Sequence, residues 1–285
     1  MVLLTPSDRT GDGMTDLSIS VAVLAAVVFL CEAIRRAAAR LLRGVYWVYL
    51  LETVSTFQLC CCSHELNLLS VKTQLEPTVS VALTFTITVI HLSTFREATC
   101  NPNAALERVY RRRGRGVPAA AVLLALQFGA AVAARHFAAS VWSLGLSDMH
   151  TQHRNLGFQC FEPLGGTVLE AAAVEFACAF TVQAAAMHVH DLDPKLRVPF
   201  FAAVITALVY TGGGVSGAFF NPALAFSIQF PCSGHTQLEY CFVYWLAPVL
   251  GMASCILLLE KIIPFTSGKS TTELNGSAAQ KQKTQ

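Results

Sequence analysis

Residues 212–223 read Gly-Gly-Gly-Val-Ser-Gly-Ala-Phe-Phe-Asn-Pro-Ala and carry the most specific structural signal in the chain. The Asn-Pro pair at Asn221 and Pro222 comes directly before Ala223 and opens a short apolar piece. Proline suits the first residue of a helix, where its missing N–H costs nothing, and asparagine suits the N-cap position before it. The stretch therefore predicts a helix beginning at Pro222, and its apolar length is about half of a membrane span.

A second copy of this pattern lies earlier in the chain, where Asn101-Pro102-Asn103 opens another short apolar piece. Each box follows a glutamate by a similar interval, Glu52 in the first case and Glu175 in the second. In both copies a phenylalanine follows the glutamate by five residues. The two short pieces are residues 101–110 and 221–230. One Asn-Pro pair also marks an ordinary turn, but two in the same register predict an internal repeat.

The composition is that of a membrane protein. Of the 285 residues, 54% are hydrophobic and only 13% are charged, against roughly 25% charged residues in soluble domains. These figures exclude a disordered chain, and the net charge of +2 gives no polycation for nucleic acid, so we expect no nucleic-acid partner. Seven stretches are long enough to cross a bilayer as helices, and none alternates with period 2. They are residues 17–34, 45–66, 78–95, 117–142, 168–188, 198–215 and 240–263.

Three of the long stretches separate the first copy of the repeat from the second. Because that number is odd, the two copies enter the membrane from opposite sides, and their half-helices meet near its middle. Their N-termini then place two positive dipole ends and the amides of Asn101 and Asn221 at one point. Such a site favours the oxygen of a neutral solute and repels cations and protons.

Basic residues predict the orientation of the chain. With the cluster at residues 35–43 placed in the cytoplasm, residues 108–115, Lys195, Arg197 and the C-terminal lysines fall on the same side. This arrangement puts the N-terminus outside and the C-terminus in the cytoplasm. The basic cluster follows residues 17–34 instead of preceding them, which disfavours a cleaved signal peptide. That stretch is either an additional span or a helix lying on the membrane surface.

Residues 45–263 resemble the aquaporin family, the major intrinsic proteins. Residues 212–223 are similar to the second signature loop of the family, and Glu52 and Glu175 match its paired membrane glutamates. Three further strings are similar to a member of the unorthodox branch, in which the first box is altered. These strings are residues 56–66, 142–146 and 243–248.

The resemblance implies an all-α membrane protein with a right-handed bundle of six transmembrane helices and two re-entrant half-helices in an inverted repeat. Residues 1–44 would form an N-terminal segment with an extra helix at 17–34, residues 45–263 the channel domain, and residues 264–285 a polar cytoplasmic tail. The two repeats would be residues 45–142 and 166–263. The resemblance also implies a homotetramer in the lipid bilayer, with one pore per subunit and no cofactor or catalysis.

The implied roles of individual residues follow from the same resemblance. Asn101 and Asn221 would be the pore asparagines, within the boxes Asn101-Pro102-Asn103 and Asn221-Pro222-Ala223. Glu52 and Glu175 would hold the re-entrant loops, because irregular backbone at membrane depth must be satisfied internally. The alternative is that these glutamates merely lie near helix ends. Water, glycerol and hydrogen peroxide would be the permeants.

Two positions depart from the usual family pattern. Asn103 stands where ordinary members have alanine, and Leu224 stands where water channels carry arginine. Spacing from the boxes puts an apolar set near the usual constriction: Val81, Val209, Ala218 and Leu224. An apolar constriction offers water fewer hydrogen bonds and excludes larger neutral solutes less. The same departures support an alternative hypothesis. In it, the chain is a poorly conducting protein of this fold with a structural or organelle-homeostasis role.

The chain has ten cysteines, and this number suggests a third hypothesis, that it is a redox or metal-handling membrane protein. Three adjacent thiols, Cys60 to Cys62, point about 100° apart on a helix and cannot converge on one metal, so packing is the simpler role. We therefore expect no metal site. Cys160 and Cys232 fall in loops on the oxidising face and are candidates for a disulfide.

Two short polar segments lie outside the long apolar stretches. His150 and His153 lie between long apolar stretches, and we expect them to be solvated loop residues. Near the C-terminus, Lys281 and Lys283 form a Lys-x-Lys-x-x pattern typical of dilysine retrieval signals, which are receptor-read addresses. With a cytoplasmic C-terminus, this pattern predicts the endoplasmic reticulum membrane.

Overall fold

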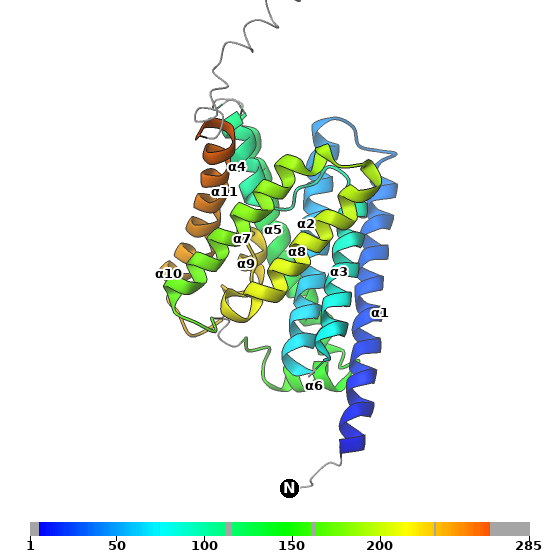
Figure 1. The fold of residues 1–285 in the computed structure, drawn as a ribbon. Helices are drawn as coiled ribbons and strands as arrows, with labels where there is room; N and C mark the ends of the chain where they lie inside the picture. Colours follow the sequence, from blue (N-terminus) through cyan, green and yellow to red (C-terminus); the bar gives the residue numbers. More distant parts are fainter. Residues whose placement is uncertain are drawn as a thin grey trace, which may run out of the picture.

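The computed structural model describes residues 6–73, 75–111, 114, 116–160, 164–230 and 232–262, and the regular structure in these residues is helical (Figure 1). The long helices are α1 (Pro6–Ala38), α2 (Val45–Lys72), α3 (Pro77–Thr94), α5 (Val117–Ser143), α7 (Val168–His188) and α8 (Pro194–Ser216). The last span, Gln237–Ile262, includes α11 (Ala247–Leu257). The short helices are α4 (Pro102–Arg111), α6 (Asp148–Asn155), α9 (Pro222–Ile228) and α10 (Gln237–Cys241).

Seven helical segments in the described residues are long and apolar enough to cross a membrane, and each of the seven predicted stretches overlaps one of them. The two predicted half-helices are α4 and α9, and both begin at the proline of an Asn-Pro box. The predicted all-α membrane fold is therefore confirmed. The first helix starts at one end of the bundle, and the last span ends at the opposite end (Figure 1).

The extra helix α1 is a full member of the bundle. A buried stripe follows one of its faces at helical spacing and packs toward α2. Ser20 at one end of this stripe donates a 2.6 Å hydrogen bond to Glu65 Oε1, and fully buried Arg35 at the other end donates a 2.6 Å hydrogen bond to Gln58 Oε1. The stripe consists of Ser20, Leu24, Val27, Cys31 and Arg35. Polar contacts at both ends set the register of α1 on α2.

The two repeats each pack one pair of helices closely, α2 with α5 and α7 with α11. In the second pair, Gly251 lies directly against the backbone of Phe176, where a Cβ atom would collide with the carbonyl oxygen. In the first pair, Ala131 and Ala134 on α5 are fully buried within a cluster that includes Cys60 and Cys61 of α2. Small residues at these positions allow the helix backbones to approach closely.

A π-helical turn at Phe242–Leu246 joins α10 to α11. Pro248 has no N–H to donate to the carbonyl oxygen four residues earlier, at Tyr244, and Ala247 donates instead to Phe242. The turn places the fully buried Tyr244 so that its hydroxyl donates a 2.7 Å hydrogen bond to the carbonyl oxygen of Ser216. This bond attaches the last span to the loop that precedes the second box.

Candidate pore

The two Asn-Pro boxes meet through a reciprocal pair of hydrogen bonds. Asn101 Nδ2 donates to the carbonyl oxygen of Phe220 at 3.2 Å, and Asn221 Nδ2 donates to the carbonyl oxygen of Cys100 at 2.7 Å. Phe220 and Cys100 are the residues directly before the two asparagines. Each box therefore holds the loop of the other, and the N-termini of α4 and α9 face the same region.

The same asparagines also cap the helices that they open. Asn221 Oδ1 accepts hydrogen bonds from the backbone N–H groups of Ala223 and Leu224, at 3.1 and 3.3 Å. Asn101 Oδ1 accepts one from Asn103 at 3.0 Å. A side-chain amide carries two N–H donors, and the opposite loop takes one from each asparagine. Each amide therefore keeps a second N–H donor that no described residue accepts.

The backbone directly before each box adopts an unusual conformation. Cys100 has φ 54° and Phe220 has φ 36°, both in the left-handed region that non-glycine residues rarely occupy. Ala218 is also left-handed, with φ 48°, and it follows Gly217, whose φ of 87° ends α8. Such strained positions persist only where surrounding contacts hold them. In this structure the two buried glutamates provide those contacts.

Glu175 holds the loop before the second box by accepting hydrogen bonds from it. Its carboxylate accepts hydrogen bonds from the backbone N–H groups of Phe219 at 2.9 Å and Phe220 at 2.5 Å. The hydroxyl of Ser216 donates a third bond at 2.7 Å. Because the side chain of Glu175 is fully buried, these donors replace the water that a carboxylate would otherwise need.

Glu52 does the same for the loop before the first box. It accepts from the backbone N–H of Cys100 at 2.6 Å and from the hydroxyl of Thr99 at 2.9 Å. Gln127 of α5 donates a further 2.6 Å bond from Nε2, and the role of this buried residue is not predicted from the sequence. Its only signal in the sequence is a polar side chain in an otherwise apolar part of residues 117–142.

A cavity of about 1270 Å³ runs past both boxes and is lined by Asn101, Asn103 and Asn221. The apolar residues expected at the constriction, Val81, Val209, Ala218 and Leu224, also line it. Val209 and Ala218 pack in one apolar cluster, whereas Leu224 packs against two other clusters. Val81 shares the cavity with them from α3.

Sequence comparisons connect this architecture to known proteins. A model of the Major intrinsic protein family matches residues 162–284. Aquaporin-11 of Homo sapiens is 35% identical over 90% of this chain and 94% of its own length. The chain belongs to the aquaporin family. Putative aquaporin-12B of Homo sapiens is 34% identical over 88% of the chain and 82% of its own length, and Aquaporin-11 of Milnesium tardigradum is 24% identical over 92% and 94%. The resemblance to the unorthodox branch is confirmed, and family membership makes the chain a multi-pass membrane channel protein.

In this aquaporin the first box ends in an asparagine. Asn103 is 6% exposed, and its Oδ1 atom has no hydrogen-bond partner among the described residues. The amide of Asn103 therefore contributes a polar group to the cavity wall. At the second box, Leu224 contributes an apolar side chain to the same cavity.

The aquaporin bundle contains a buried polar cluster at its α6 end, and this cluster corrects one expectation. His150 is fully buried and lies 3.0 Å from Glu65 Oε1, and Trp142 donates a 2.8 Å bond from Nε1 to Glu65 Oε2. His153 is 7% exposed and packs its ring against Trp142. The prediction of solvated histidines was wrong, because α6 folds inward and covers the ends of α2 and α5.

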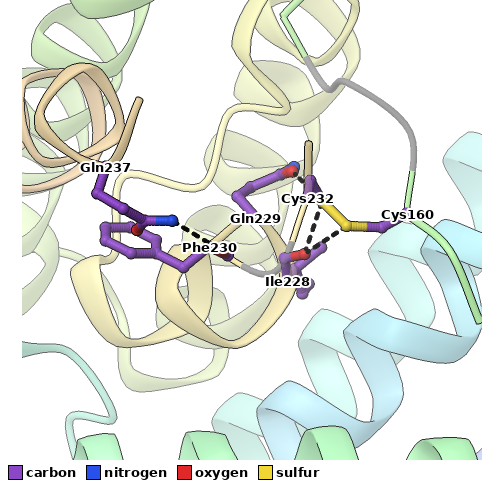
Figure 2. Close-up of a disulfide and its surroundings, with 6 residues drawn as sticks. All are labelled: Cys160, Ile228, Gln229, Phe230, Cys232 and Gln237. Carbon is purple, nitrogen blue, oxygen red and sulfur yellow. Dashed lines mark hydrogen bonds between the residues drawn. A yellow bond between two sulfur atoms is a disulfide. The ribbon is translucent and has the colours of Figure 1, made fainter. Parts of the chain in front are cut away.

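Cys160 and Cys232 are joined in a disulfide, with their Cα atoms 4.9 Å apart (Figure 2). The sulfur of Cys232 lies 3.3 Å from the carbonyl oxygen of Ile228, the last residue of α9. Nearby, Gln237 donates a 3.2 Å bond from Nε2 to the carbonyl oxygen of Phe230. The disulfide therefore ties the segment before α7 to the end of the second half-helix.

Cys60, Cys61 and Cys62 are buried in the α1–α2–α5 core. Within the described ranges, histidine, cysteine and acidic side chains form no group of three that suits a metal ion. Lys281 and Lys283 lie outside the described residues.

Proposed function

We propose that this aquaporin passively conducts water and small neutral solutes, including glycerol and hydrogen peroxide, through the cavity at the two Asn-Pro boxes. The observation that supports this most directly is the reciprocal pair of hydrogen bonds from Asn101 to Phe220 and from Asn221 to Cys100. These bonds hold two amide donors beside one cavity, and both line it. A solute oxygen that passes this point can accept from either amide.

The surroundings of the boxes favour neutral solutes. The N-terminal ends of α4 and α9 carry partial positive charge, which raises the energy of a passing cation or hydronium ion. Val81, Val209 and Leu224 line the same cavity with apolar surface. Because the wall there offers few hydrogen bonds, water gains less of an advantage over glycerol and hydrogen peroxide than in a polar constriction.

The test is flux through liposomes that contain the purified protein. Stopped-flow light scattering measures water and glycerol, and an enclosed peroxide-sensitive dye measures hydrogen peroxide. We expect flux of all three above that of empty vesicles, and loss of this flux in the Asn101→Asp/Asn221→Asp variant. A second variant, Val209→Trp, fills the cavity without adding charge and should also reduce flux.

The matched control is Leu250→Trp, which places the same bulk on an exposed position of α11. It should leave flux unchanged. Folded protein that conducts none of the three solutes above the empty-vesicle level would overturn the channel function. That result would favour the rival, a poorly conducting protein with a structural role.

We also propose a homotetramer in the lipid bilayer of the endoplasmic reticulum, with the C-terminus in the cytoplasm. The family resemblance supports the tetramer, and the dilysine pattern at Lys281 and Lys283 supports the location. Native mass spectrometry of the detergent-solubilised protein tests the assembly. Replacing both lysines by serine should move the tagged protein to the cell surface. Unchanged retention of this variant in the endoplasmic reticulum would contradict the retrieval signal.

A further inference from the structure

The charged residues that line the cavity all have the same sign. Within the described parts of the chain they are Lys72, Arg96 and Arg135, and no aspartate or glutamate lines the cavity. A narrow passage with walls of low dielectric focuses the field of such charges along its length. The lining is therefore electropositive beyond the contribution of the half-helix N-termini.

Arg96 and Lys72 each have another explanation. Arg96 lies 3.6 Å from Glu32 of α1 and stacks over the ring of Trp47, so part of its charge is neutralised. Lys72 is the last residue of α2, at the end of the bundle, and interacts with another group there. Each of these two cations therefore already interacts with groups other than a solute in the cavity.

Arg135 differs from both. It lies in the interior of α5, about two helical turns before the end of that helix at Ser143. Its side chain is half-buried, and within the described residues it forms no hydrogen bond or ion pair. A cation at this depth without a carboxylate is costly, and such residues mark functional positions in membrane proteins.

The position of Arg135 along the cavity follows from contacts one turn earlier. The carbonyl oxygen of Ala131, four residues before Arg135, accepts a 2.8 Å hydrogen bond from the hydroxyl of Ser227. Ser227 lies on α9 three residues after Leu224 and also contacts His64 Nε2 at 3.0 Å. His64 lines the cavity and lies within the electrostatic reach of Arg135. Arg135 therefore faces the passage between Leu224 and the mouth beside α6.

We propose that Arg135 is a selectivity residue of the pore, a fixed charge on α5 that excludes cations from the stretch beyond Leu224. This role rests on the proposed channel function. A unit charge acting over roughly 10 Å at an effective dielectric of about 20 changes the barrier for a monovalent cation by about a factor of ten. Neutral solutes do not experience this barrier, and the guanidinium still offers them hydrogen-bond donors.

The experiment compares cation leak with neutral flux in the same liposomes. Proton leak is followed with an enclosed pH dye under a potassium diffusion potential, and water flux by light scattering. We expect Arg135→Gln to raise proton and potassium leak about tenfold, with water flux unchanged within about twofold, and Arg135→Lys to keep the leak low. The matched control is Arg154→Gln, because exposed Arg154 bonds the carbonyl oxygen of Ser143 and does not line the cavity.

A second variant tests the charge with Arg135 in place. Ala139 also lines the cavity one turn further along α5, so Ala139→Glu should pair with Arg135 and neutralise it, whereas Ala139→Gln should not. If the cation leak is higher in Ala139→Glu than in Ala139→Gln, the result supports the proposal even if Arg135→Gln fails to fold.

Three results would count against the proposal. A folded Arg135→Gln channel with wild-type water flux and wild-type leak would overturn it, and lower thermal stability alone in that variant would indicate an anchoring role at the membrane surface. Ala139→Glu and Ala139→Gln proteins with equal leak would overturn it as well. Wild-type vesicles without water or peroxide flux would instead overturn the channel function itself, and this role of Arg135 with it.

Discussion

Asn221 donates a 2.7 Å hydrogen bond from its side-chain amide to the carbonyl oxygen of Cys100, the residue directly before the opposite Asn-Pro box. The bond joins residues 121 positions apart and has a counterpart from Asn101 to Phe220. Both accepting residues have left-handed backbone, and both give their N–H groups to a buried glutamate. The centre of the molecule is therefore one connected polar network inside an apolar bundle.

We expect Asn221→Ala to lower the free energy of unfolding by about 3 kcal/mol. The change removes the cap of α9, worth about 1 kcal/mol, and leaves the carbonyl oxygen of Cys100 without its partner, which costs about 1–3 kcal/mol. Tryptophan fluorescence during denaturant unfolding in detergent measures the loss. Asn155→Ala, at an exposed position of α6, is the control, and equal midpoints for the two variants would contradict the network.

Glu175→Gln tests the carboxylate that holds the second box. The new amide turns an N–H group toward donors that need an acceptor, at Phe219, Phe220 or Ser216. Leaving a buried donor unsatisfied costs about 1–3 kcal/mol, so we expect a lower melting temperature and less monodisperse protein. Glu170→Gln on the same helix changes only an exposed N-terminal cap. If both variants melt together, the loop is held by other contacts.

Removal of the disulfide should destabilise the protein strongly. The bond closes a loop of 72 residues, for which the chain-entropy relation gives about 4 kcal/mol. Cys232→Ser should therefore melt well below the wild type under oxidising conditions, and the two should converge in reductant. Cys241→Ser removes a free, half-buried thiol and should behave like the wild type in both conditions. A wild-type melting temperature that does not respond to reductant would refute this prediction.

Gly251→Ala should loosen the packing of α11 on α7. A Cβ atom at this position meets the backbone of Phe176, and overpacking of this kind costs about 1–3 kcal/mol. Gly129→Ala is a matched control within α5, because an added Cβ meets nothing within 4 Å there. That control should be neutral or stabilised, since alanine favours the helix. Differential scanning fluorimetry compares the two, and a neutral Gly251→Ala would show that the helices can move apart freely.

Stability should fall at acidic pH because of His153, which lies on α6 outside the spans. Burial, followed by the charges of Lys72 and His150, lowers the pKa of His153 below its ordinary value of about 6.5. The unfolded chain then binds a proton more readily than the folded one, so stability is complete above pH 6.5 and decreases as the pH falls below it. We expect the melting temperature to drop from pH 7 to pH 5, and to drop less in His153→Phe. The exposed His190→Gln is the control and should keep the wild-type slope.

Local features of the chain predicted most of the fold. Apolar length identified the seven long helices, because a helix that crosses a bilayer satisfies its own backbone and needs only apolar side chains along its length. The Asn-Pro pairs located the starts of α4 and α9, because capping depends on residues within one turn. The glutamates at positions 52 and 175 were predicted as loop supports through the family resemblance. The contacts found here agree with that role, which the Glu175→Gln experiment tests.

Gln127, His150 and Arg135 show what the sequence by itself left undecided. Each is a polar residue in or beside an apolar stretch, and its neighbours in the chain do not reveal whether it faces lipid, water or protein. Gln127 bonds Glu52, 75 positions away, and His150 lies against Glu65, 85 positions away. Only the packing of α5 and α6 against α2 brings these partners together.

The sequence therefore determined the helices, the two half-helices and the family, because hydropathy and capping act over a few neighbouring residues. The tertiary structure decided which polar groups meet inside the bundle, including the reciprocal bonds of the two boxes and the place of Arg135 on the cavity wall. The physical reason is that a buried hydrogen bond or charge depends on partners from distant segments, and the position of those segments is set by the packing of the whole bundle.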